Sequence, residues 1–358
     1  GLYFPTILFI ASIATAFVMF VMYFGGNWVA TLAIDLGVMY VFIAYVGSFF
    51  DPVMQLASIL ARFQQAQASA ERLMSLIETE PEIWDTDEVI AEYGDAIDFK
   101  KENWETLVGD IKFDDVTFKY HKGEEVLTNF NLDIKAGESI ALVGHTGAGK
   151  STIVNLICRF YEPTTGKILI DGKDYKERSL GWLHDNLGYV LQSPHLFSGT
   201  ILDNIKYGKE DALMEEVIEA TKLVEAHDFI MEFEDGYETE VGEGGARLSV
   251  GQKQLISFAR ALIANPSILI LDEATSSVDT KTEKSIQKAI EVVLKGRTSF
   301  VVAHRLSTIT TSDRILVLED GKIIESGTHR ELIKKEGKYY QLYTNQFISD
   351  QIEASKSM

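Results

Sequence analysis

The chain has 358 residues, a length that suggests two or three domains, and 46% of its residues are hydrophobic, which is enough for a large core. Its formal net charge of −20 argues against a nucleic-acid partner, because the phosphates of a nucleic acid would be repelled. The single cysteine, Cys158, excludes an intrachain disulfide and fits a domain that faces the reducing cytosol.

Two long apolar segments open the chain. Residues 1–34 carry no charged side chain, and residues 2–24 are long enough to cross a bilayer, which takes roughly 20 residues. A second apolar segment covers residues 36–61, and the first basic residue, Arg62, follows it. The positive-inside tendency then places the end of the second segment in the cytoplasm. We expect two antiparallel membrane helices, the second continuing to Pro81; a buried hairpin of a soluble protein is the alternative.

The first apolar segment carries no charge from its first residue onward and does not begin with Met. It also lacks the basic region and the cleavage site of a signal peptide. We therefore interpret the chain as a piece of a longer protein. Residues 82–109 are acidic and without clear periodicity, so they are expected to form a linker whose aromatic side chains dock on a neighbouring surface. Residues 110–120 and 126–134 alternate apolar and polar side chains, as half-buried strands do. An aromatic at the end of the first strand, Tyr120, is suited to stacking on a purine ring.

A glycine-rich loop stands between a strand-like and a helix-like segment. The apolar residues 139–143 lead into it, and residues 153–160 favour a helix. The loop matches G-x-x-x-x-G-K-[ST], whose glycines allow backbone N–H groups to surround an anion. Lys150 adds positive charge, Ser151 offers a hydroxyl for Mg²⁺, and the helix N-terminus favours negative charge. The motif predicts a nucleoside triphosphate site made of Gly144, His145, Thr146, Gly147, Ala148, Gly149, Lys150, Ser151 and Thr152.

Two further strands end in residues suited to phosphate chemistry. Residues 267–271 are apolar and lead into Asp272 and Glu273. In a doubly wound sheet, the carboxyl ends of the strands face the ligand, so Asp272 is placed to hold the metal and Glu273 to polarise an attacking water. Residues 298–303 form another strand, followed by His304, which could contact the γ-phosphate or that water. Strands alternating with helices predict a mainly parallel sheet.

Taken together and in order, these stretches resemble the ATP-binding domain of an ABC transporter over residues 110–345, and they look most like its exporter branch. The matching stretches are GHTGAGKST (Walker A), Gln192 (Q-loop), LSVGQKQ at 248–254 (signature), ILILDEATSSVD at 268–279 (Walker B and D-loop) and His304 in VVAHRLST (switch histidine). Residues 1–80 resemble the last two of six membrane helices and their cytoplasmic extension. Residues 81–109 would then be a linker, longer than usual, and residues 346–358 a tail.

The resemblance implies a fold class, namely a P-loop α/β ATPase domain with a mainly parallel sheet, an antiparallel β layer and a helical subdomain, plus transmembrane helices. It implies ATP and Mg²⁺ as ligands. It assigns adenine stacking to Tyr120, catalysis to Glu273 and His304, the D-loop to Asp279, and the metal to Ser151, Gln192 and Asp272. It also implies a head-to-tail dimer in which the partner's ATP meets Ser249, Val250, Gly251 and Gln252.

The resemblance further implies ATP-driven export, with the helices in the cell membrane, among its lipids, and the ATP-binding domain in the cytoplasm. Small lipophilic drugs or lipids are the expected substrates, and peptide export is an alternative. Val250 stands where the family commonly has glycine, which weakly favours a heterodimer with another half-transporter over a homodimer. A soluble ABC-type ATPase that acts on DNA or ribosomes, or a regulatory module that binds ATP without turnover, are the rival classes.

Overall fold

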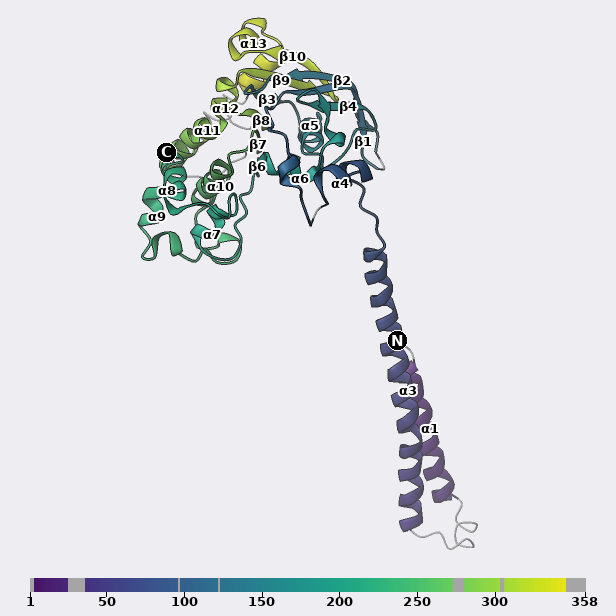
Figure 1. Cartoon of the computed structure of the whole chain (residues 1–358). Coiled ribbons are helices and arrows are strands. Elements are labelled where there is room, and N and C mark those ends of the chain that lie inside the picture. Colours follow the sequence, from purple (N-terminus) through teal and green to yellow (C-terminus); the bar gives the residue numbers. More distant parts are fainter. Residues whose placement is uncertain are drawn as a thin grey trace. The chain divides into compact units, whose positions relative to one another are not determined.

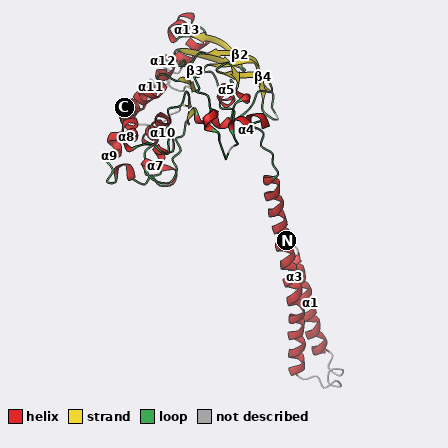
Figure 2. Ribbon diagram, viewed as in Figure 1, coloured by secondary structure: helices red, strands yellow, loops and turns green. Residues whose placement is uncertain are grey.

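A computed structural model of the chain describes residues 3–24, 36–95, 97–121, 123–272, 280–302 and 306–345 (Figure 1). The chain divides into two compact units, residues 1–82 and residues 83–358. The first unit is purely helical among its described residues, whereas the second combines two sheets with helices (Figure 2).

The helices of the first unit are α1 (Tyr3–Phe24) and α3 (Leu36–Ile77), which contact each other. The 22 residues of α1 span about 33 Å at 1.5 Å per residue, which matches the thickness of a bilayer core. The 42 residues of α3 continue through Pro52 and make a helix about twice as long. Both helices are long and apolar enough to cross a membrane, judged by length and composition alone.

The second unit contains a six-stranded sheet and a smaller antiparallel sheet of four strands. The larger sheet has the order β10 (Lys322–Gly327), β9 (Arg314–Glu319), β3 (Ser139–Val143), β8 (Thr298–Val302), β7 (Ile268–Asp272) and β6 (Leu187–Val190). Its strands pair in parallel except for β10, which is antiparallel to β9. The smaller sheet has the order β2 (Glu125–Ile134), β1 (Ile111–Lys119), β4 (Thr165–Ile170) and β5 (Lys173–Asp174).

Helices cover both faces of the larger sheet. The helices described in the second unit are, in chain order, α4 (Asp87–Tyr93), α5 (Lys150–Ile157), α6 (Leu180–Asp185), α7 (Ile201–Lys206), α8 (Met214–Leu223), α9 (His227–Met231), α10 (Val250–Ala264), α11 (Thr280–Leu294), α12 (Leu306–Thr311) and α13 (His329–Lys335). Short 3₁₀ turns lie at Lys101–Asn103, Tyr175–Glu177, Gly236–Glu238 and Glu243–Gly245. The predicted class is confirmed, with a parallel core, an antiparallel layer and a helical part built from α7 to α10.

The alternation of side chains along each strand separates two hydrophobic cores. On β7, Ile268 and Ile270 belong to the core that contains α5 and the antiparallel sheet. Their neighbours Leu269 and Leu271 face the other side and pack with α10 and α11. The helices α5 and α10 therefore cover opposite faces of the sheet, as Figure 1 also shows. Because both faces of its central strands are buried, polar side chains that act on a ligand are expected at the ends of these strands.

Residues 83–109, expected to be a linker, pack within the second unit. The short helix α4 begins at an N-cap, where the Thr86 side chain accepts a hydrogen bond from the Val89 backbone, and it buries Val89 and Tyr93. The Trp182 indole donates a hydrogen bond of 2.7 Å to the carbonyl of Glu105. This segment therefore belongs to the second unit.

Candidate nucleotide site

The glycine-rich loop joins β3 to α5 at the carboxyl edge of the six-stranded sheet. Gly147 and Gly149 adopt φ of 86° and 101°, in the left-handed region that glycine enters without steric cost. Gly149 is the N-cap of α5, and among the described residues no side chain caps this helix end, so its first N–H groups can bind an anion. The loop is tied to the β9–β10 turn, where the Gly321 N–H donates to the Ala148 carbonyl at 3.2 Å.

Lys150 lies folded over the loop. Its Nζ donates hydrogen bonds to the carbonyls of Gly144, at 2.7 Å, and His145, at 3.0 Å. Burial lowers the pKa of Lys150 from its ordinary value, and the negative charge of Asp272 partly opposes this. The Asp272 carboxylate, at the end of β7, is thus close enough to act electrostatically on Lys150. The structure brings these two predicted residues together.

The two residues after Lys150 have different environments. Ser151 is exposed at the first turn of α5, where its hydroxyl is accessible, whereas Thr152 is buried. The Thr152 hydroxyl forms a hydrogen bond of 3.1 Å with the Tyr120 hydroxyl. The Tyr120 ring makes edge-on contacts with Phe118 and Tyr161. Tyr120 is therefore held against the helix that carries the loop, as adenine stacking beside the phosphates would require.

Of the other predicted site residues, the structure describes Gln192. Gln192 is exposed and follows the last residue of β6 by two positions, at the same carboxyl edge as Asp272 and the loop. Glu273, Asp279 and His304 lie outside the described residues. Their roles stay predictions.

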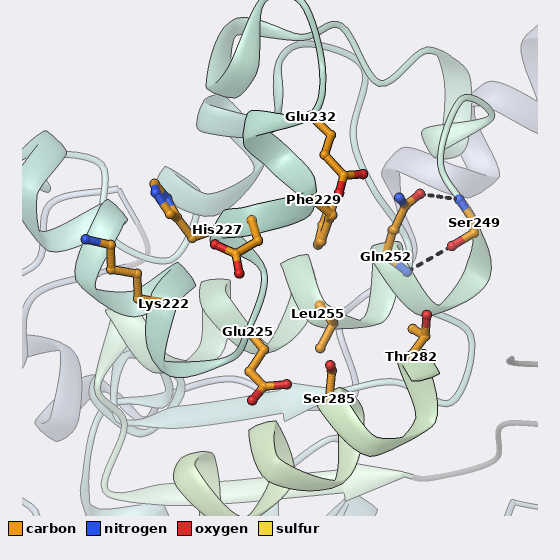
Figure 3. A pocket seen from close by; sticks show the side chains of 11 residues that line it. Lys222, Glu225, His227, Phe229, Glu232, Ser249, Gln252, Leu255, Thr282 and Ser285 are labelled. Atoms are coloured by element: carbon orange, nitrogen blue, oxygen red, sulfur yellow. Dashed lines mark hydrogen bonds between the residues drawn. The ribbon is translucent and has the colours of Figure 1, made fainter. Parts of the chain in front are cut away.

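The signature residues form the N-terminus of α10. Ser249 is the N-cap, and its Oγ accepts a hydrogen bond of 3.2 Å from the Gln252 backbone N–H. The Gln252 Oε1 in turn accepts from the Ser249 N–H at 2.9 Å, which completes a capping box (Figure 3). Since Ser249 Oγ accepts from its own helix, its O–H proton is left to donate outward. Gly251 is buried, while Val250 is 49% exposed.

A pocket of about 740 Å³ adjoins the signature, between α8, α9, α10 and α11 (Figure 3). Ser249 and Gln252 form one margin, and three carboxylates from Glu225, Asp228 and Glu232 line the remainder with Lys222 and His227. Carboxylates would repel a polyphosphate. Phosphate groups are therefore expected at the α10 N-terminus itself, and not inside this pocket.

One buried charged side chain, beyond the C-terminal end of α5, was not predicted from the sequence. Arg159 follows the end of α5 by two residues and is 2% exposed. It pairs with Asp85 from the segment expected to be a linker, at 3.0 Å. An arginine directly after an apolar helix was a sequence signal of a buried ion pair, but nothing in the sequence pointed to its partner.

Most residues of this site lie within a segment that matches a known protein family. Residues 127–276 match the family model described as "ABC transporter". This segment contains the phosphate loop, the signature and the β7 carboxylate. The ATP-binding domain of this chain belongs to the ABC transporter family. Domains of this family bind ATP and hydrolyse it to power transport, so this domain is an ATPase domain.

Relatives extend the similarity to the helical unit. A putative multidrug export ATP-binding/permease protein of Bacillus subtilis is 44% identical over 322 residues, which cover 90% of this chain and 53% of that protein. An ATP-dependent lipid A-core flippase of Syntrophus aciditrophicus is 42% identical over 348 residues, 97% of this chain and 55% of the flippase. The chain thus spans about half the length of the curated relatives it matches.

A solved structure shows the same architecture. It is a bacterial Atm1-family ABC exporter with ATP bound, with a TM-score of 0.68 and 38% sequence identity. The match covers 87% of this chain and 52% of the exporter chain. The combination of an ABC ATPase domain with N-terminal apolar helices is therefore shared with an exporter.

Lys150→Ala should weaken ATP binding about 10- to 150-fold, because a charge-assisted hydrogen bond contributes roughly 1.5–3 kcal/mol. A fluorescent ATP analogue titrated into the purified protein measures this. Lys135→Ala is the matched control, since Lys135 pairs with Asp133 on the exposed surface and should leave affinity unchanged. Equal affinity in the Lys150 and Lys135 variants would refute the phosphate-loop assignment.

Tyr120→Ala should lower ATP affinity about 5- to 100-fold, since stacking of a base on an aromatic ring contributes roughly 1–3 kcal/mol. Tyr120→Phe keeps the ring but loses the hydroxyl that contacts Thr152, so most of the affinity should remain. The same titration separates the two variants. A Phe variant as weak as the Ala variant would assign the effect to the hydroxyl and argue against stacking.

Proposed function

We propose that this chain serves in an ATP-driven ABC exporter, in which nucleotide binding and hydrolysis in the second unit drive the membrane helices of the first between inward- and outward-facing states. The observation that carries the proposal is the covalent joining, in one chain, of two bilayer-length apolar helices and an ABC ATPase domain. The named relatives that share this arrangement are exporters and a flippase.

The ATP is proposed to bind between two ATPase domains. Within one chain, α5 and α10 cover opposite faces of the sheet, so the exposed N-terminus of α10 is not used by the loop that precedes α5. A second domain, from a copy of this chain or from another ABC half-transporter, would bring its phosphates to Ser249 and Gly251. Ser249 would donate its O–H outward while its own helix satisfies its acceptor.

Mg²⁺ fits the residues at the loop. Ser151 offers an exposed hydroxyl, Asp272 a carboxylate whose charge reaches the loop, and Gln192 an amide oxygen at the same edge. Oxygen donors are what Mg²⁺ prefers, and the bound ion would offset the charge that develops on the phosphates. Glu273 is proposed to orient and polarise the attacking water, and His304 to contact the γ-phosphate.

The substrate is proposed to be a lipophilic small molecule or a lipid. The printed names of relatives refer to multidrug export and to a lipid A-core flippase, and the exposed side chains of α1 and α3 are largely apolar and aromatic. The location is proposed to be the cell membrane, with the ATP-binding unit in the cytoplasm, because Arg62 follows the apolar part of α3. Peptide export is the alternative, and transport assays with lipophilic and peptide substrates would distinguish the two.

Glu273→Gln should lower ATP turnover about 100- to 10,000-fold, the range for loss of general base catalysis, while ATP affinity stays the same. The full-length protein in proteoliposomes allows phosphate release and the movement of a fluorescent phospholipid or a lipophilic dye to be followed together. We expect both to require ATP and both to fall in the variant.

Three results would contradict the proposal in different ways. Unchanged turnover would remove Glu273 from catalysis. ATP hydrolysis that moves neither probe would argue for peptide export or for a different role. A protein that an alkaline wash releases from membranes would favour a soluble ABC-type ATPase.

Ser249→Ala should reduce turnover about 10- to 150-fold without weakening the binding of ATP to the phosphate loop, because it removes one hydrogen bond to a charged phosphate. It also removes a helix cap, at a cost of about 1 kcal/mol in stability. Thr328→Ala removes a capping box of the same kind from α13, far from the signature in sequence, and controls for that loss. Equal turnover in both variants would count against the composite site.

A further inference from the structure

The segment that follows α3 is fastened to the end of α5 by a buried ion pair. Arg159 lies two residues beyond Ile157, the last residue of α5, with a left-handed φ of 53°. It is 2% exposed, and burying a guanidinium is costly unless each of its donors finds a partner. The partners of Arg159 therefore define what this position does.

All three guanidinium nitrogens donate hydrogen bonds. Nη1 donates to Asp85 Oδ1 at 3.0 Å and to the Arg178 carbonyl at 3.2 Å, and Nη2 donates to the Trp84 carbonyl at 3.3 Å. Nε donates to Glu162 Oε1 at 2.9 Å. Burial alone would raise the pKa of Glu162, but hydrogen bonds from Lys176 and Arg159 outweigh it and hold that pKa below its ordinary value. The guanidinium is thus shared between the chain end of α5 and the segment that follows α3.

Asp85 connects a second helix to the same point. Its Oδ1 and Oδ2 accept from the Leu180 N–H, at 3.1 and 2.9 Å, at the first residue of α6. The side chain of Asp85 is only 14% exposed. The Asp85 carboxylate therefore connects three parts of the chain: the end of α5, the start of α6 and the segment that contains Asp85 itself.

The position of the Asp85–Arg159 contact in the chain would let it transmit a displacement of α5 to the segment that follows α3. Asp85 comes within eight residues of Ile77, the last residue of α3. At its other end, α5 carries Lys150 and Ser151, and its eight residues span only about 12 Å as a rigid rod. A shift of the loop on nucleotide binding would therefore displace Arg159, and Asp85 with it.

We infer that Asp85 and Arg159 are positioning residues that couple occupancy of the phosphate loop to the segment leaving α3. The inference rests on the proposed function, because it requires ATP to bind at the loop. It adds a route of coupling that runs from α5 through one buried ion pair to Asp85 and then along the backbone toward α3.

A second ion pair, between the 3₁₀ turn at Lys101–Asn103 and α6, offers a control. Lys101 pairs with Asp185 at the end of α6 at 3.2 Å, but these side chains are 62% and 53% exposed. Exposed pairs contribute little to structure and are screened by salt. Loss of this pair should have no effect on the coupling.

Hydrogen exchange measured by mass spectrometry tests the inference on the full-length protein in lipid nanodiscs, with Glu273→Gln present to retain bound ATP. In this parent, ATP with Mg²⁺ should slow exchange over residues 144–152 and change it over residues 78–95. Asp85→Ala should abolish at least half of the change over 78–95 and leave the protection of 144–152 in place. Asp185→Ala should behave as the parent does.

Asp85→Asn and Arg159→Lys serve where the alanine variant does not fold. Asn keeps an oxygen for the Leu180 N–H but loses the charge, so its ATP-dependent change over residues 78–95 should lie between those of the parent and the alanine variant. Lys keeps the charge but loses the three-way hydrogen bonding, and should resemble the alanine variant. A full change in either, equal to the parent's, would overturn the inference.

Two failures of the parent are distinguishable. Protection of residues 144–152 by ATP without any change over residues 78–95 would overturn the coupling role alone. No protection of residues 144–152 would overturn the proposed nucleotide site, and the inference with it.

Discussion

The burial of the central parallel strands on both faces is the constraint from which the rest of the second unit follows. On β3, Ile140 and Leu142 pack in one core, and Ala141 between them packs in another, so the strand has no surface on which a polar side chain can function. Polar chemistry can appear only where such strands end. The glycine-rich loop after β3, Asp272 at the end of β7 and Gln192 after β6 all occur at that one edge because the strands are parallel. The two cores hold the start of the loop in place, which lets its backbone N–H groups be arranged before any phosphate arrives.

The same two-sided burial separates the two helix ends at which phosphate binding is proposed. The helix α5 packs on one face of the sheet and α10 on the other. The N-terminus of α10 is already capped by Ser249 and Gln252, so it is ordered without a ligand. Because this helix end is already ordered, it would lose little conformational entropy on contact with the phosphates bound to a partner domain. Val250 projects from the first turn of this end, and an exposed β-branched side chain there is compatible with the helix because the residue needs no positive φ.

Much of this could be predicted from the sequence, and the remainder could not, for identifiable physical reasons. The loop, Lys150, Ser151 and the strand before Asp272 follow from local patterns, and each is a contiguous stretch whose conformation is set by its own residues. The capping box at Ser249 and Gln252 is also local, because it needs only a serine and a glutamine three positions apart. The contact of Asp85 with Arg159 joins residues 74 positions apart, and no periodicity records such a pair. The bounds of the short helices α7 to α9 could not be predicted either, because they are set by tertiary packing and not by a pattern in the sequence.

The buried pair at Arg159 is better explained by specificity than by stability. Replacing a buried ion pair with well-packed apolar groups is often neutral or even stabilising, so stability alone does not account for its presence. An apolar contact at this point would tolerate several registers of the segment that follows α3. The guanidinium, by contrast, requires Asp85, Glu162 and the Trp84 carbonyl in a single arrangement, and any slip leaves a buried charge unpaired. One register is therefore strongly preferred, and a displacement of α5 is passed to that segment instead of being absorbed by sliding. A route of this kind needs no additional contact surface, since the chain itself continues from Asp85 back to α3.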